Sequence, residues 1–177
     1  YCSGYPEDFI VSIKNELHFD QTQTMVCDIV DVFPDDVRIL NPLLRHFGGV
    51  CRFHGPVRTI QSFEDNVLIK QTLETQGQGA VLVVDGGESL RCALIGGNLA
   101  ALAHKNGWAG MIIAGAVRDV PELRVVQIGI MAISAFPKSS GKKGAGDVGA
   151  AIRIAGQIIH DGDYLYADED GIAVATK

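Results

Sequence analysis

Short apolar runs alternate along the chain with segments whose apolar residues recur at helical spacing. The apolar runs predict buried strands at residues 80–87, 93–95, 108–115 and 129–137, and the alternating segment 55–63 predicts a further strand. The helical spacing, with proline and glycine as stop signals, predicts helices at residues 6–17, 24–33, 39–49, 64–79 and 98–106.

The order strand, helix, strand over residues 93–115 predicts a parallel crossover unit. The polar, glycine-rich stretch 138–147 predicts a loop. From Ala151 onward the pattern predicts several short strands, with turns at Asp161-Gly162 and Asp170-Gly171. The fold class we expect is therefore one mixed α/β domain.

Composition and charge narrow the class of protein. The chain has 177 residues, of which 47% are hydrophobic, and this is enough for one full core. Its net charge of −6 argues against direct nucleic-acid binding, which needs a basic face. No apolar run approaches the roughly 20 residues of a membrane span, so we expect no membrane insertion and a cytoplasmic location.

The cysteines and histidines give no sign of a zinc site. Cys2, Cys27, Cys51 and Cys92 form no C-x-x-C pair, so we expect reduced, buried thiols. The five histidines lack metal-ligand spacing. Lys142-Lys143 lies in a glycine-rich loop, but the segment lacks the glycine and the hydroxyl residue of a phosphate-binding loop.

Two segments of the crossover unit carry candidate chemistry. Gly96-Gly97-Asn98-Leu99 precedes the predicted helix, whose free N–H groups favour an anion, with Asn98 as N-cap. Arg118-Asp119 follows the next buried strand, so both segments should lie at one sheet edge. Arginine suits a carboxylate, and aspartate suits Mg²⁺ or Mn²⁺. The alternatives are an ordinary tight turn and a surface ion pair. Asp85-Gly86-Gly87 belongs either to the same rim or, as we expect, to a turn.

Six stretches, in this order, resemble one protein family: FEDN, VLVVDGG, ALIGGNLAALAHKNGWAG, GAVRDVPEL, IGIMA and GDYLYADEDGIAV. The chain resembles the family of regulator of ribonuclease activity A (RraA-like) and the class II 4-hydroxy-4-methyl-2-oxoglutarate aldolases. The likeness runs from about Thr24 to Thr176, which leaves an N-terminal extension at 1–20 and a single RraA-like domain at 21–177. It implies a swivelling β/β/α fold, with mixed sheets and flanking helices. It also implies a homotrimer, or a hexamer of two trimers.

In the aldolases, the pair that matches Arg118-Asp119 acts together with a divalent metal cation, Mg²⁺ or Mn²⁺. The resemblance implies that Asp119 holds the metal and that Arg118 is catalytic and binds the substrate. The backbone of Gly96, Gly97, Asn98 and Leu99 would bind another substrate oxygen. The substrate would be a small 2-oxo acid, cleaved or decarboxylated through a pyruvate enolate that the metal stabilises.

The chain departs from the aldolase signature, which is Asp, twenty residues, then Arg-Asp. Position 97, twenty-one residues before Arg118, is glycine. The side chain of the neighbouring Asn98 should point in another direction at the helix start and so should not replace the missing aspartate. Two hypotheses follow. The first is a metal-dependent 4-hydroxy-4-methyl-2-oxoglutarate aldolase or oxaloacetate decarboxylase. The second is a regulator without catalysis that binds a ribonuclease of the E type or an RNA helicase, as acidic family members named ribonuclease regulators do.

Overall fold

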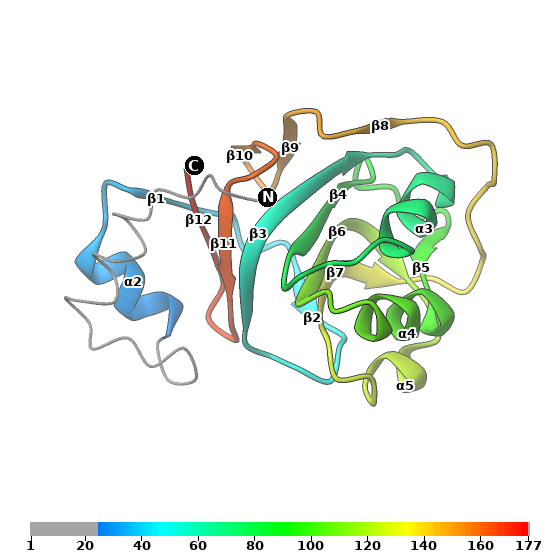
Figure 1. The fold of residues 1–177 in the computed structure, drawn as a ribbon, viewed down its shortest axis with the longest axis horizontal. Coiled ribbons are helices and arrows are strands. Elements are labelled where there is room, and N and C mark those ends of the chain that lie inside the picture. Colours follow the sequence, from blue (N-terminus) through cyan, green and yellow to red (C-terminus); the bar gives the residue numbers. More distant parts are fainter. Residues whose placement is uncertain (1–24, 177) are drawn as a thin grey trace.

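The structure of the chain is a computed structural model that describes residues 25–176 (Figure 1). Its helices are α2 (Val26–Val32), α3 (Val67–Leu73), α4 (Gly97–Lys105) and α5 (Val120–Leu123). Its strands are β1 (Val37–Ile39), β2 (Arg45–His46), β3 (Phe53–Gln61), β4 (Val81–Asp85), β5 (Ala93–Ile95), β6 (Gly110–Val117), β7 (Gly129–Ala135), β8 (Asp147–Val148), β9 (Ile152–Ile154), β10 (Gln157–Ile159), β11 (Tyr164–Ala167) and β12 (Ile172–Ala175).

The long strand β3 joins two halves of one mixed sheet. Its residues 53–56 pair antiparallel with β11, whereas residues 57–61 pair parallel with β4. On one side β12 and β1 continue the antiparallel half, and on the other side β6 and β7 continue the parallel half. Figure 1 shows β3 curving between these two groups of strands. β5 pairs parallel with β6 outside the main order of strands.

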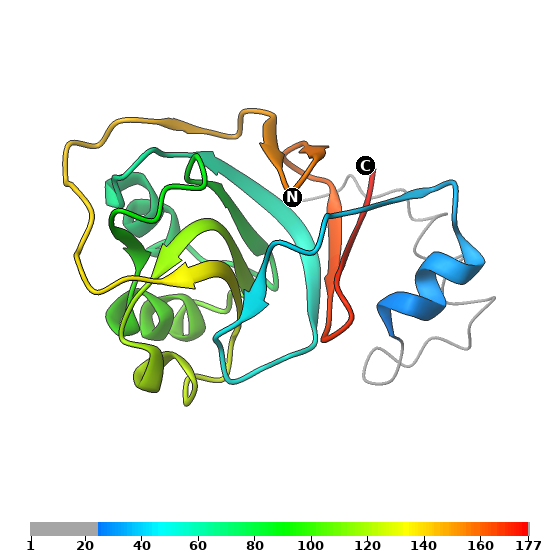
Figure 2. The same ribbon diagram turned by 180° about the vertical axis from the view of Figure 1, so that it is seen from behind.

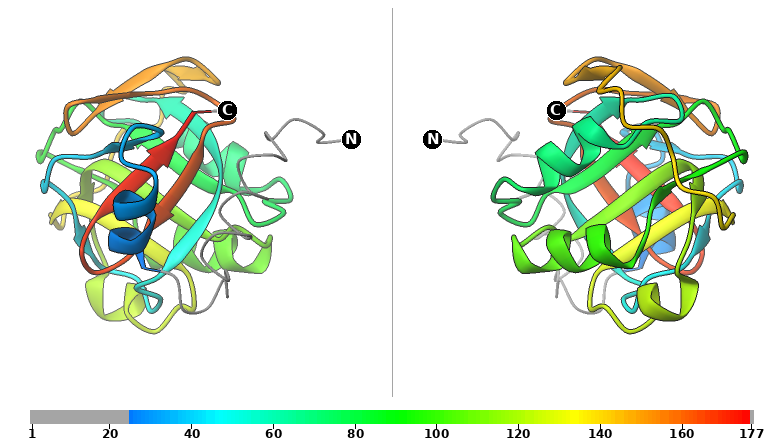
Figure 3. Two further views of the ribbon diagram at one scale, coloured as in Figure 1. Left: turned by 90° about the vertical axis from the view of Figure 1, so that its left-hand side faces the viewer. Right: turned by 90° about the vertical axis from the view of Figure 1, so that its right-hand side faces the viewer.

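Helices α3, α4 and α5 cover one face of the parallel half, as Figure 1 and the right panel of Figure 3 show. Alternate residues of β4 and β6 point to opposite faces of the sheet, so each strand contributes to two cores. The core under the helices includes Leu82, Val84, Met111, Ile113, Ile69, Leu73, Ala100 and Leu123. The core on the opposite face includes Val81, Val83, Ile112, Ile152, Ile154, Ile159 and Leu165.

Helix α2 lies against the antiparallel half, beside β12 (left panel of Figure 3). Its apolar residues Val26 and Ile29 pack with Ala173 and Ala175 in a third, smaller core. The segment between β7 and β9 runs along the outside of the domain (Figure 2). In the described part of the chain, no helix is both long and apolar enough to cross a membrane.

Most of the predicted elements are confirmed, including the parallel crossover unit of β5, α4 and β6. The predicted helix at 39–49 is wrong, because this segment ends β1 and then forms β2, which pairs with β7. Pro42 interrupts any helix there, and the Phe47 N–H donates to the carbonyl of Ile130 instead. The predicted helix at 6–17 lies outside the described residues.

Among the described cysteines, the prediction of buried thiols is confirmed only for Cys92. Cys92 is buried and Cys51 is half-buried, but Cys27 on α2 is exposed. All three are unpaired, and Cys2 lies outside the described residues.

A buried carboxylate fastens the glycine-rich loop to the helical layer. Asp65, just before α3, accepts hydrogen bonds from the N–H groups of Val67 (2.9 Å), Lys143 and Gly144 (3.2 Å). Burial raises the pKa of this carboxyl, but the three N–H groups outweigh burial and hold its pKa below the ordinary value. Its contribution to stability is therefore present at neutral pH and is lost as the pH falls through the folded-state pKa.

We predict that Asp65→Ala lowers the free energy of unfolding by about 2–3 kcal/mol at neutral pH, because three N–H groups lose their acceptor. Denaturant unfolding measures this change. Asp147→Ala is the control, since Asp147 is exposed on β8, the strand that follows the same loop; its change should stay within about 0.5 kcal/mol. Equal losses in the two variants would contradict this role of Asp65.

Candidate functional site

The candidate site lies where β5 and β6 end side by side. Ile95 at the end of β5 is in register with Val117 at the end of β6. The N–H of Arg118 donates to the carbonyl of Ile95 at 2.9 Å. The chain therefore leaves both strands from adjacent points, one toward α4 and the other toward α5. This confirms that the two predicted segments share one edge of the sheet.

The carboxylate of Asp119 lies at the start of α4. Gly96 is the N-cap residue of this helix and has no side chain to cap it. Instead, the Gly97 N–H donates to Asp119 Oδ2 at 3.1 Å. A negative charge at a helix N-terminus is favourable because the free N–H groups there carry partial positive charge. The prediction that Asn98 is the N-cap is wrong, since Asn98 lies inside the first turn and is exposed.

The backbone of Asp119 turns sharply to direct its side chain toward α4. Asp119 has left-handed dihedral angles (φ 57°, ψ 41°), which aspartate tolerates better than most residues. Its carbonyl accepts the N–H groups of Glu122 (2.8 Å) and Leu123 (3.0 Å), which starts the short helix α5. Leu123 is fully buried in the core under the helices and so fixes α5 in place.

Gly96 makes room for the charged pair. A Cβ atom at Gly96 would lie 2.5 Å from Asp119 Oδ2 and 3.3 Å from Arg118 Nε. The φ of Gly96 is −137°, which any residue can adopt, so the backbone does not require glycine at this position. A side chain at position 96 would displace the Arg118 and Asp119 side chains from these positions.

Arg118 and Asp119 do not neutralise each other by a tight contact. Arg118 Nε lies 3.7 Å from Asp119 Oδ2, and the two side chains are 42% and 39% exposed. An ion pair so long and so open to water contributes little to stability. The guanidinium and the carboxylate thus remain accessible to a ligand, which favours a binding role over the alternative of a surface ion pair.

A second carboxylate, which sequence reasoning missed, lies beside Gly97. A Cβ atom at Gly97 would lie 1.9 Å from Glu122 Oε2 and 2.9 Å from Glu122 Cδ. The signal was present in the sequence, because Glu122 follows Asp119 by three residues, directly after Pro121. Proline near a helix start fixes that spacing as one helical turn, which brings residues three apart onto one face.

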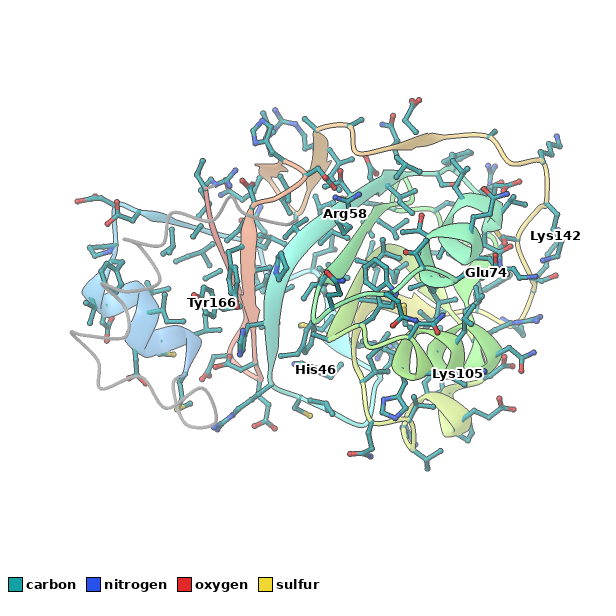
Figure 4. The ribbon with its side chains drawn as sticks, viewed as in Figure 1. His46, Arg58, Glu74, Lys105, Lys142 and Tyr166 are labelled. Carbon is teal, nitrogen blue, oxygen red and sulfur yellow. The ribbon has the colours of Figure 1, made fainter. Side chains whose placement is uncertain are left out.

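The remaining predicted residues lie at three places. Leu99 lies in the first turn of α4, as Asn98 does, and is half-buried, whereas Lys105 is the last residue of this helix. Asp85 belongs to a turn, as expected, since its Oδ1 accepts the Gly87 N–H at 2.9 Å. Lys142 lies on the outer loop (Figure 4), and its Nζ donates to Asn66 Oδ1 at 3.3 Å.

The donor set at this edge consists of two carboxylates, those of Asp119 and Glu122. Within residues 25–176, no cluster of three or more His, Cys, Asp or Glu side chains could hold a metal ion. Mg²⁺ and Mn²⁺ fit a site with one or two carboxylates, because such ions keep several water molecules or take substrate oxygens as further ligands. The oxygen-only chemistry of this pair is compatible with those ions and unsuited to zinc.

The chain belongs to the RraA-like family, described as aldolase/RraA, whose model matches residues 24–174. It is 53% identical over 150 residues to a protein of Alkalilimnicola ehrlichii that is provisionally named 4-hydroxy-4-methyl-2-oxoglutarate aldolase. That match covers 85% of this chain and 93% of the relative.

Two solved structures share the fold at substantial identity. One is the RNA-processing inhibitor RraA from Thermus thermophilis, with a TM-score of 0.84, 46% identity and coverage of 86% of this chain and 93% of that one. The other is named S-adenosylmethionine:2-dimethylmenaquinone methyltransferase, from Geobacillus kaustophilus, with a TM-score of 0.85, 42% identity and coverage of 87% and 96%. The RraA-like α/β fold expected from the sequence is thus confirmed.

The cap formed by Asp119 predicts different effects for two substitutions. Asp119→Ala should lower the free energy of unfolding by about 1–2 kcal/mol, because it removes the acceptor for the Gly97 N–H and puts alanine in a left-handed conformation. Asp119→Asn keeps an acceptor oxygen and tolerates that conformation, so its loss should stay below about 0.5 kcal/mol. Denaturant unfolding compares the two, and equal losses would argue against the cap.

Proposed function

We propose that the protein is a divalent-metal-dependent carbon–carbon lyase that acts on small 2-oxo acids. Its substrates would be 4-hydroxy-4-methyl-2-oxoglutarate, oxaloacetate or both. The observation that carries this proposal is the position of Arg118 and Asp119, held together at the N-terminus of α4 with both side chains open to a ligand. Relatives provisionally named as aldolases, at about half identity, support the same class of reaction.

Asp119 would hold the metal, with Glu122 close by. When bound, Mg²⁺ or Mn²⁺ supplies Lewis-acid charge against the oxygens of the 2-oxo acid. Arg118 offers a planar array of N–H donors to the substrate carboxylate or to the negative charge that develops during the reaction. The N–H groups of Asn98 and Leu99 have no acceptor within α4, because they belong to its first turn and no helical carbonyl lies four residues before them, so they would bind a further substrate oxygen.

Both candidate reactions break the bond between the third and fourth carbons of the substrate. The electron pair of that bond moves toward the 2-oxo oxygen, which becomes negatively charged. Oxaloacetate loses carbon dioxide in this step. In the hydroxylated substrate, water takes the hydroxyl proton, and the carbon that bore the hydroxyl leaves as the carbonyl carbon of one pyruvate. In either case water then gives a proton to the third carbon, and the remaining fragment becomes pyruvate. A fixed cation such as Arg118 stabilises the transient charge without having to reorganise.

We predict that Arg118→Ala lowers kcat/KM for pyruvate release by about 100- to 1000-fold, the cost typical of losing one donor to a developing negative charge. Asp119→Asn, which should keep the fold, should abolish the metal-dependent part of the rate. Coupled detection of pyruvate, with Mn²⁺ present and the metal-only rate subtracted, measures both effects.

Arg124→Ala serves as the matched control, because Arg124 is an exposed arginine at the end of α5 with no assigned part in the site. Its turnover should remain that of the unmodified chain. Unchanged turnover in Asp119→Asn would overturn the assignment of the metal to Asp119. A loss in Arg124→Ala as large as that in Arg118→Ala would show that a general loss of positive charge, rather than the placed guanidinium, causes the effect.

A regulator of RNA processing is the second candidate function. One observation favours it, namely 46% identity to a structure described as an RNA-processing inhibitor. In that role the chain would bind a ribonuclease or an RNA helicase through its acidic surface and would need neither metal nor Arg118. The net charge of −6 suits binding to the basic, RNA-binding surface of such a partner.

The regulator hypothesis predicts that the purified chain slows RNA cleavage by a ribonuclease of the E type. The Asp119→Asn variant should slow this cleavage as much as the unmodified chain does. Cleavage of a labelled RNA, with and without the chain, measures this. Absence of any inhibition at a large molar excess would contradict the hypothesis. Inhibition that disappears in Asp119→Asn would instead tie it to the candidate site. The homotrimer that the family resemblance implies stays a prediction.

A further inference from the structure

We propose that Glu122 supplies the second carboxylate of the cation site and takes the place of the aspartate that the aldolase signature puts at position 97. This inference rests on the proposed function, because it deepens the account of the same site. Glycine at position 97 would then leave the space, and glutamate at position 122 would place its carboxylate there. The departure at Gly97 would move a carboxylate rather than remove it.

The first support is where the Glu122 side chain lies. Its Oε2 is 1.9 Å from the place where a Cβ at position 97 would be, and its Cδ and Cβ lie within 3.0 Å of it. The carboxyl group therefore occupies the space that the first atoms of an aspartate at 97 would fill. An aspartate side chain and the present Glu122 conformation cannot exist together, since real Cβ atoms do not approach other atoms so closely.

The second support is that nothing else requires glycine at position 97. Gly97 is the first residue of α4 and is helical, so its backbone does not need the left-handed region that favours glycine. Glycine in a helix is less favourable than alanine. The three atoms nearest to a Cβ at position 97 all belong to Glu122. Glycine at position 97 thus leaves the space that the Glu122 carboxylate occupies.

The third support is that both carboxylates converge on one residue. Asp119 Oδ2 accepts the N–H of Gly97, and Glu122 lies against the side of the same residue where a Cβ would project. Asp119 and Glu122 are three apart across the start of α5, whose position the buried Leu123 fixes. Two carboxylates that both lie against the first residue of α4 suit a divalent cation that completes its shell with water or substrate oxygens.

The test is Mn²⁺ binding to the full chain, followed by electron paramagnetic resonance of the free ion, in the absence of substrate. We expect Glu122→Gln, which keeps the size of the side chain and removes its charge, to weaken Mn²⁺ binding by about 10- to 100-fold. Glu74→Gln is the control, because Glu74 is an exposed glutamate at the end of α3 (Figure 4) and should leave the Kd unchanged.

A second variant moves the carboxylate back to position 97. Glu122→Ala should weaken Mn²⁺ binding as Glu122→Gln does, and the double variant Gly97→Asp/Glu122→Ala should regain at least about tenfold of that loss. Because the double variant restores binding by adding a group, misfolding of the single variants cannot imitate this result. A double variant as weak as Glu122→Ala would overturn the equivalence of the two positions.

The failure of this inference is distinguishable from failure of the proposed function. If the unmodified chain binds no Mn²⁺, the metal-dependent lyase and this inference fail together. If the unmodified chain binds Mn²⁺ and Glu122→Gln binds it equally well, only the role of Glu122 fails. If Glu122→Gln changes the unfolding free energy but not the Kd for Mn²⁺, Glu122 acts only as a favourable charge at the start of α4.

Discussion

The hydrogen bond from the Gly97 N–H to Asp119 is the interaction on which the rest of the site depends. It joins the beginning of α4 to the end of β6, and the bond from Arg118 N–H to Ile95 holds the two strand ends together behind it. A helix that starts with two glycines has no side chain of its own to satisfy its first N–H groups. The fold resolves this by bringing a carboxylate from the neighbouring strand, and the same carboxylate is the candidate metal ligand.

The two glycines and the two carboxylates form complementary pairs. A side chain at Gly96 would meet Asp119, and a side chain at Gly97 would meet Glu122. Both glycines have backbone conformations that other residues adopt, and their lack of a side chain leaves room for the neighbouring acids. Viewed from the sequence alone, Gly97 is a missing ligand. Viewed in the structure, it is the space into which Glu122 reaches. The lyase proposal rests on Arg118 and Asp119 at the start of α4, and the pairing of Glu122 with Gly97 would account for the departure from the aldolase signature.

The sequence predicted the parallel core because strands buried on both faces leave continuous apolar runs, as in β4 and β6. It also predicted that Gly96 and Arg118 lie at one edge of the sheet, because the carboxyl ends of parallel strands meet on the same side. It failed at 39–49, where pairing of two residues with β7 decides the conformation. It failed on the N-cap as well, because the capping group comes from a residue 22 positions away. The sequence spacing places Glu122 one turn after Asp119, but its contact with Gly97 depends on how α5 packs against α4 and could not be predicted.

The most direct test of the account is pyruvate release by the unmodified chain. Oxaloacetate and 4-hydroxy-4-methyl-2-oxoglutarate would each be incubated with Mn²⁺, with Mg²⁺ and with a chelator, and the rate due to the metal alone would be subtracted. The account predicts metal-dependent release above that background on at least one of the two substrates, and none with chelator. No release above background with either metal on either substrate would contradict a metal-dependent lyase.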